Sequence, residues 1–172
     1  MQSSARELFA GLSMAAALAA VLVFAIPEAA RAQATQLDLH GEWQGSGTDR
    51  NDADERPTAV KCRASNQVSG GNLRLSMSCD GTAGREDISA TLQVTDAVVK
   101  GTLRRSSPDL PFAVSGSVSG RTAGANTTFD VRALFKTRAR VMVALLNASS
   151  YQLRVIDPEA GVTLMNVIFR KS

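Results

Sequence analysis

Apolar and polar residues alternate one by one over most of this chain, and this period of two restricts the possible folds more than any other feature. In residues 73–79, Leu, Leu, Met and Cys are interleaved with Arg and two Ser. Such a run predicts a strand with one apolar face and one face in water, as in antiparallel sheets. The same alternation recurs in residues 60–64, 88–94, 99–103, 112–118 and 129–135.

Turn-forming residues separate these stretches, among them Gly70-Gly71, Asp80-Gly81 and Gly124-Ala125-Asn126. With a first strand near residue 41 and three more after residue 140, the chain contains about ten short strands and no convincing helical segment. This pattern predicts an all-β fold. Because the turns are short and consecutive, we expect a small antiparallel up-and-down β-barrel of about 8–10 strands, closed so that no edge is exposed.

One stretch departs from the alternation, since residues 141–146 are apolar at every position. A strand covered on both faces would have this composition, and so would a strand that exposes an apolar stripe to a partner. We favour burial on both faces.

The first 32 residues predict a cleaved signal peptide. Residues 9–26 are an almost unbroken apolar run that Pro27 ends, and Ala30-Arg31-Ala32 fits the small-residue rule for signal peptidase. An uncleaved anchor is the alternative, because about 18 apolar residues can span a bilayer. With cleavage after Ala32, we expect residues 33–172 to form a single β-barrel domain with no stable membrane span.

The chain has two cysteines, Cys62 and Cys79, and both follow the predicted signal. Two cysteines in an exported protein usually pair. They lie on adjacent predicted strands joined by a Gly-Gly turn, so we expect a structural disulfide between them. A redox or metal pair is disfavoured, because their spacing is long and no further ligand is evident.

Basic residues gather in the second half of the chain, which has a formal net charge of +3 overall. Arg132, Lys136, Arg138 and Arg140 form a candidate contact surface for an anionic partner. The alternative is a solvated outer face, because arginines in this half mostly alternate with apolar residues. We expect no nucleic-acid partner, since an exported protein meets little nucleic acid.

Gly41-Glu42-Trp43 resembles the G-x-W opening of calycin-type barrels, which include lipocalins, avidins and small secreted bacterial metalloprotease inhibitors. The resemblance implies that Trp43 seals the closed end of the barrel. It also implies that a basic residue of a late strand, Arg170 or Arg154, packs across the indole ring. Ser46 and Gly47 extend the opening into a Gly-Ser-Gly pattern that is similar to exported proteins of Gram-negative bacteria. Together with the predicted signal peptide, it leads us to expect a periplasmic or secreted location in such a bacterium.

Common catalytic and cofactor-binding patterns are missing from the sequence. His40 is the sole histidine and no nucleophile motif accompanies it. One histidine and a paired set of cysteines cannot complete a zinc site, and no phosphate loop or dinucleotide fingerprint occurs. The acidic loop of residues 48–57 lacks the glycine of a calcium loop. We therefore expect a protein that is not an enzyme and has no cofactor or metal.

Two functions remain open. In the first, the barrel binds a small apolar or amphipathic molecule at its mouth, as calycins do. In the second, the barrel is filled and the protein acts through its surface, as an envelope-interaction protein or a protease inhibitor. Contacts would then come from the loop of residues 48–57 or from the segment of residues 132–140.

Overall fold

The structure, a computed structural model, describes residues 39–172 except residues 83, 109–112 and 134–137. The predicted signal peptide and Lys136 thus lie outside the described residues. Within the described part, the chain forms ten strands and no helix: β1 (Gly41–Asp49), β2 (Thr58–Ser69), β3 (Asn72–Gly81), β4 (Gly84–Thr95), β5 (Val98–Ser106), β6 (Val114–Ala123), β7 (Asn126–Ala133), β8 (Arg138–Asn147), β9 (Ser150–Ile156) and β10 (Thr163–Lys171).

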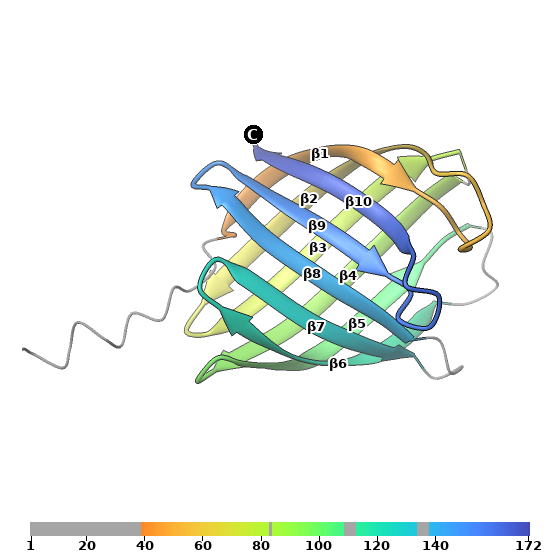
Figure 1. Cartoon of the computed structure of the whole chain (residues 1–172). Coiled ribbons are helices and arrows are strands. Elements are labelled where there is room, and N and C mark those ends of the chain that lie inside the picture. The colour runs from red at the N-terminus through yellow and green to blue at the C-terminus, as the bar shows by residue number, and fades with distance from the viewer. Residues whose placement is uncertain (1–38, 83, 109–112, 134–137) are drawn as a thin grey trace, which may run out of the picture. The chain divides into compact units, whose positions relative to one another are not determined.

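Each strand pairs antiparallel with the strands next to it in the sequence, and β1 also pairs with β10 (Figure 1). The sheet therefore closes into an up-and-down barrel, which confirms the predicted fold class. The closing pair joins Trp43 to Lys171 and Asp49 to Met165. Among the described residues there is no helix of the length and hydropathy needed to cross a membrane.

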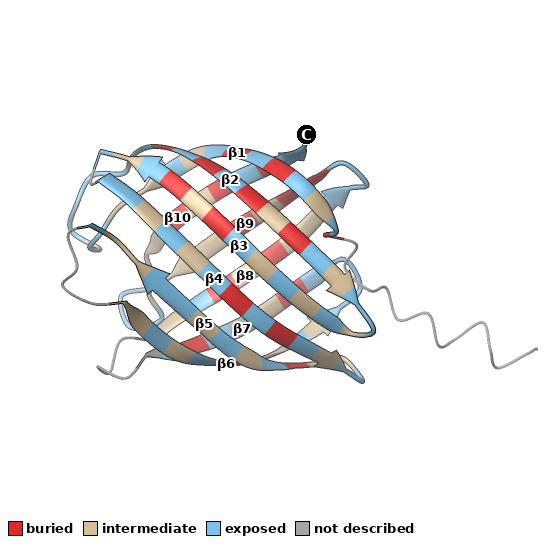
Figure 2. Cartoon of the chain, turned by 180° about the vertical axis from the view of Figure 1, so that it is seen from behind, coloured by how far each residue is buried: buried red, intermediate tan, exposed pale blue. Residues whose placement is uncertain are grey.

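Burial follows the alternation read from the sequence, with red and pale blue residues succeeding one another along the strands in Figure 2. The inward residues of β1 to β10 join one hydrophobic core, to which every strand contributes. Its largest fully buried side chains are Trp43, Tyr151 and Phe169. The outward residues are mostly serine, threonine, arginine and other polar types, as expected for strands with one face in water.

The expectation for residues 141–146 is wrong. The barrel wall is a single layer, so the outward residues of β8 are not covered by a second sheet. Leu146 is 51% exposed, and Met142 and Ala144 are only partly buried. The inward residues Val141 and Val143 are buried, so this strand has one core face like the others.

At two positions on the inward face of the barrel, a neighbouring strand lies so close that only glycine fits. A Cβ atom on Gly47 would lie 1.9 Å from the carbonyl oxygen of Asn166, and one on Gly101 would lie 2.1 Å from that of Thr91. No side chain fits at either distance, so these glycines permit the tight curvature of β1 and β5.

The two ends of the barrel differ. At one end, strands are joined by two-residue turns, at residues 70–71, 96–97, 124–125 and 148–149, and β1 begins and β10 ends there. At the other end, on the right in Figure 1, longer connections occur, including residues 50–57 and 157–162. We call these the closed end and the mouth.

Candidate functional site

The predicted disulfide is present. Cys62 on β2 and Cys79 on β3 are directly paired in the sheet, with 4.0 Å between their Cα atoms. Both residues are buried in the core. The disulfide therefore links two adjacent strands inside the barrel wall, which fits a structural role.

Trp43 lies at the closed end and is 1% exposed. Its Nε1–H donates a hydrogen bond to the carbonyl oxygen of Leu39 at 2.8 Å, so the chain before β1 folds beneath the indole. The ring packs edge-on to Tyr151, with 4.9 Å between centroids, and Tyr151 stacks on Phe169 at 4.7 Å. Three aromatic side chains from β1, β9 and β10 thus close this end. Gly41 begins β1 at a φ of +119°, which favours glycine.

The cation over Trp43 is Lys171, not Arg170. The Lys171 ammonium lies 5.5 Å from the centre of the indole ring. Lys171 is paired with Trp43 and shares its inward face, whereas Arg170 is paired with Gln44 and is exposed. Because successive strand residues point to opposite faces, the expectation for Arg170 was off by one residue. Arg154 instead donates a hydrogen bond to the Thr163 hydroxyl at 3.1 Å.

Tyr151 is the only tyrosine of the chain, and its burial makes the folding stability depend on pH in the alkaline range. Burial raises the pKa of its hydroxyl to about 12, with an opposing contribution from the nearby Asn66 side chain. No hydrogen bond of normal geometry joins these two side chains. Because the folded pKa exceeds the unfolded value, the contribution of Tyr151 to folding stability is fully present below pH 10 and is lost as the pH rises from about 10 to 12, at up to about 1.4 kcal/mol per pH unit.

An absorbance titration near 295 nm checks this prediction, since one phenolate alone contributes. We expect no folded-state ionisation at pH 10 and unfolding that accompanies ionisation at higher pH. Half-ionisation of folded protein at pH 10 would contradict it.

The mouth carries three inward charged residues that the sequence analysis did not single out. Glu86 on β4 and Arg105 on β5 form an ion pair, in which Arg105 Nε donates to Glu86 Oε2 at 3.1 Å and Arg105 Nη2 donates to Glu86 Oε1. The Glu86 side chain is only 12% exposed, against 45% for Arg105. The pair therefore closes part of the mouth from one side.

Asp49, the last residue of β1, also has its side chain on the inward face at the mouth and is half-buried. Burial raises the pKa of its carboxyl and the negative charge of Glu86 raises it further, whereas the hydrogen bond from the Arg50 backbone amide and the positive charge of Arg105 lower it. The three groups are thus close enough to influence one another. Among these three groups, two carboxylates stand against one guanidinium.

Apolar residues below these charges are incompletely covered. Ile88, which pairs with Arg105, is partly exposed, and so are Leu103 on β5 and Val155 on β9. Val114, the other neighbour of Arg105, is partly exposed as well. The mouth therefore combines an apolar floor with a charged rim.

The loop of residues 50–57 beside the mouth is held by hydrogen bonds between its own residues. Arg50 Nη1 donates to the carbonyl oxygens of Ala53 at 3.1 Å and Glu55 at 3.2 Å, and the Asn51 amide donates to the Glu55 carboxylate at 3.1 Å. The described residues contain no group of three His, Cys, Asp or Glu side chains placed to hold a metal ion.

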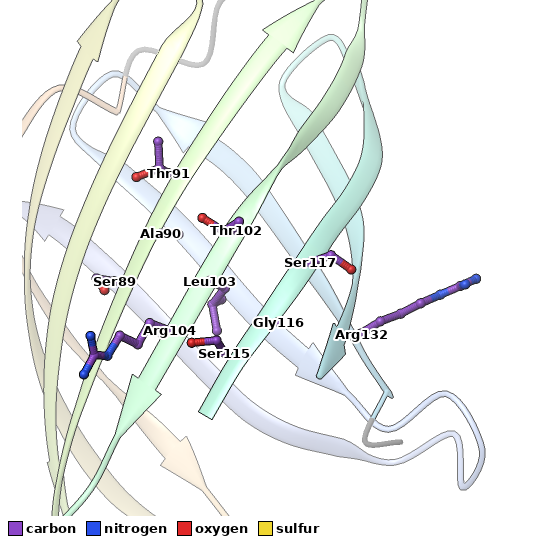
Figure 3. Close-up of a pocket in the computed structure, with 10 residues that line it drawn as sticks. All are labelled: Ser89, Ala90, Thr91, Thr102, Leu103, Arg104, Ser115, Gly116, Ser117 and Arg132. Carbon is purple, nitrogen blue, oxygen red and sulfur yellow. The ribbon is translucent and has the colours of Figure 1, made fainter. Parts of the chain in front are cut away.

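A separate hollow of about 650 Å³ lies over β4 to β7 (Figure 3). Arg132, one of the predicted surface residues, belongs to it. Seven of its lining residues are exposed outward positions, and between them lie three residues of the inward face. The lining consists of Ser89, Ala90, Thr91, Thr102, Leu103, Arg104, Ser115, Gly116, Ser117 and Arg132.

The other predicted contact residues lie beside this hollow. Arg138 is exposed and is paired with Arg132 across β7 and β8. Arg140 is engaged by Asp130, with 2.9 Å between Nε and Oδ1. The structure thus brings Arg132 and Arg138 together and commits Arg140 to an ion pair.

A continued alternation could have found the mouth residues. Ile88 and Leu103 were assigned to the inward face, so the residues two positions away, Glu86 and Arg105, share it. The pairing of their charges across β4 and β5 needs the sheet register, which the sequence does not show.

Comparison of the chain with models of protein families, with curated proteins and with solved structures finds no match. The ten-stranded closed barrel is compatible with a calycin-like architecture. Membership of the lipocalins, avidins or metalloprotease inhibitors has no support beyond the short motif around Trp43.

Proposed function

We propose that this protein is an exported, non-enzymatic binding protein whose barrel mouth takes a small amphipathic molecule with a positively charged end. The observation that carries the proposal is the half-buried Asp49 carboxylate above an incompletely covered apolar floor. Burial of a carboxylate costs stability, and the raised pKa of Asp49 indicates that the Arg50 backbone amide and the Arg105 guanidinium offset this cost only in part. A cationic ligand would offset more of it, and its apolar part would cover Ile88 and Leu103.

The filled interior limits how deep such a ligand reaches. Every strand contributes buried side chains to one core, and the aromatic cluster occupies the closed end. The ligand therefore sits at the mouth rather than along the barrel axis. The longer connections at the mouth and the short turns at the closed end support a ligand site at the mouth.

The disulfide supports export, because such bonds persist in oxidising compartments such as the bacterial periplasm. A periplasmic or secreted location and a cleaved signal peptide are therefore part of the proposal. The absence of catalysis is part of the proposal as well.

The test is calorimetric titration with three ligands that share a ten-carbon tail and differ in the charge of the head group. Decylamine is positively charged at pH 7, decanol is neutral and decanoate is negatively charged. We expect saturable binding in the order decylamine, decanol, decanoate. Asp49→Asn removes the negative charge and should lower the preference for decylamine over decanol about fivefold, because one partly desolvated charge contact is lost.

Asp49→Asn should not destabilise the fold, because the raised pKa of Asp49 means that folding disfavours its ionised form. Its melting temperature at pH 7 should therefore be at least that of the parent. Asp80→Asn, at an exposed position on β3, is the matched control and should leave the preference unchanged. Equal binding of all three ligands, or an unchanged preference in Asp49→Asn, would contradict the proposal.

The outer hollow supports a second function, recognition of a partner through the surface. Most residues lining it point outward, whereas the mouth residues point inward, although Leu103 belongs to both linings.

A further inference from the structure

The outward residues of β3 to β7 place a row of hydroxyl groups between two guanidinium groups. The register pairs Arg74 with Thr91, Thr91 with Thr102, Thr102 with Ser117, and Ser117 with Arg132. All five residues are exposed. We call this set the outer row. Since neighbouring strands lie about 4.8 Å apart, it extends over about 19 Å across the strands.

A second row runs beside it and adds another cation. Ser89, Arg104 and Ser115 are paired across β4, β5 and β6, and all three are exposed. Residues of both rows line the hollow of about 650 Å³. Figure 3 shows the Arg132 side chain extending away from the strands and the Arg104 side chain reaching toward Ser89 on the neighbouring strand.

The charge of this surface is positive and uncompensated. Within the described residues, neither Arg104 nor Arg132 forms an ion pair. The acidic residues beside the rows are already engaged, Asp130 by Arg140 and Asp87 by Arg85. The side chains of Arg104 and Arg132 therefore remain available to an anionic ligand.

The polar character of the surface narrows the class of ligand. Protein interfaces usually anchor on buried aromatic or large apolar side chains, and the outward residues lining the hollow include none. Hydroxyl groups donate and accept hydrogen bonds, so they suit a ligand that is itself rich in hydroxyls. The length of the outer row suits an extended chain rather than a single small ion.

From these observations we infer that the outer face of β3 to β7 binds an acidic polysaccharide strand lying across the strands. Arg104 and Arg132 contact its anionic groups, and Thr91, Thr102 and Ser117 contact its hydroxyls. The site is separate from the mouth and does not depend on the function proposed for it.

Calorimetric titration with an oligogalacturonate long enough to span the outer row tests this inference. We expect one class of sites, and binding that weakens as NaCl is raised, because exposed charges are screened. Arg104→Gln with Arg132→Gln should weaken binding about tenfold through the loss of two charge-assisted contacts. The control Arg63→Gln with Arg121→Gln has the same net charge at exposed positions outside the two rows and should change binding less than about twofold.

Two further ligands and one further variant identify the chemistry. Thr102→Val keeps the shape of the side chain and removes its hydroxyl, and it should weaken oligogalacturonate binding measurably while leaving polyphosphate binding unchanged. Neutral dextran should bind far more weakly. Equal binding of dextran, tighter binding of polyphosphate, or equal effects of the two double variants would overturn the inference. Unchanged melting temperatures of all variants would show that their weaker binding does not come from a loss of folded structure.

Discussion

Replacement of Trp43 by alanine is expected to lower the free energy of unfolding by about 3–5 kcal/mol, the usual cost of removing a buried aromatic side chain. The indole is 1% exposed, packs edge-on to Tyr151 and holds Leu39 through a hydrogen bond of 2.8 Å. Alanine removes all three interactions at once. A fall in melting temperature of about 10–20 °C should follow for a domain of this size.

Circular dichroism melts of the parent, Trp43→Ala and Trp43→Phe check this expectation. Phenylalanine keeps an aromatic ring against Tyr151 and loses the hydrogen bond to Leu39, so its loss of stability should be clearly smaller. Lys171→Ala tests the cation over the indole and should cost at most about 1 kcal/mol at this exposed position. A melt of Trp43→Ala that matches the parent would show that the aromatic cluster does not stabilise the closed end.

Removal of the disulfide by the double substitution Cys62→Ala and Cys79→Ala is expected to cost about 3 kcal/mol. The two cysteines are 17 residues apart in the sequence, and a crosslink closing a loop of that length restricts the unfolded chain by about this amount. Both positions are buried, so alanine also leaves a small loss of packing.

Urea unfolding of the double variant and of the oxidised and reduced parent measures this effect. The reduced parent should resemble the double variant, since both lack the crosslink. The two forms should share the fold, because eight residue pairs besides the cysteines join β2 to β3, from Lys61 with Asp80 to Ser69 with Asn72. A difference below about 1 kcal/mol between oxidised and reduced protein would contradict the structural role.

The strands that form the barrel wall could be predicted from the sequence, because alternation with a period of two decides which face of each strand is buried. It located Cys62 and Cys79 on adjacent strands for the same reason. Closure of the barrel followed from short turns and the need to cover edges. These inferences depend on local pattern, and the structure confirms the fold class and the disulfide.

Features that depend on register or on layer number were harder to predict. Lys171 takes the position expected for Arg170 because the register of β1 and β10 pairs Lys171 with Trp43 and leaves Arg170 on the outward face. Leu146 is exposed because a closed barrel has one layer, whereas its sequence resembles a strand between two layers. Glu86 and Arg105 meet only because the register of β4 and β5 pairs neighbouring positions.

The location of a bound ligand tests the central claim most directly. We would titrate uniformly labelled protein with decylamine and follow the backbone amide and indole N–H signals by NMR. Saturable shifts concentrated at Asp49, Glu86, Ile88, Leu103 and Arg105, with an unchanged indole signal of Trp43 at the closed end, are the result that the account predicts. Shifts confined to the closed end or the outer face, or no saturable shifts at all, would contradict a ligand site at the mouth.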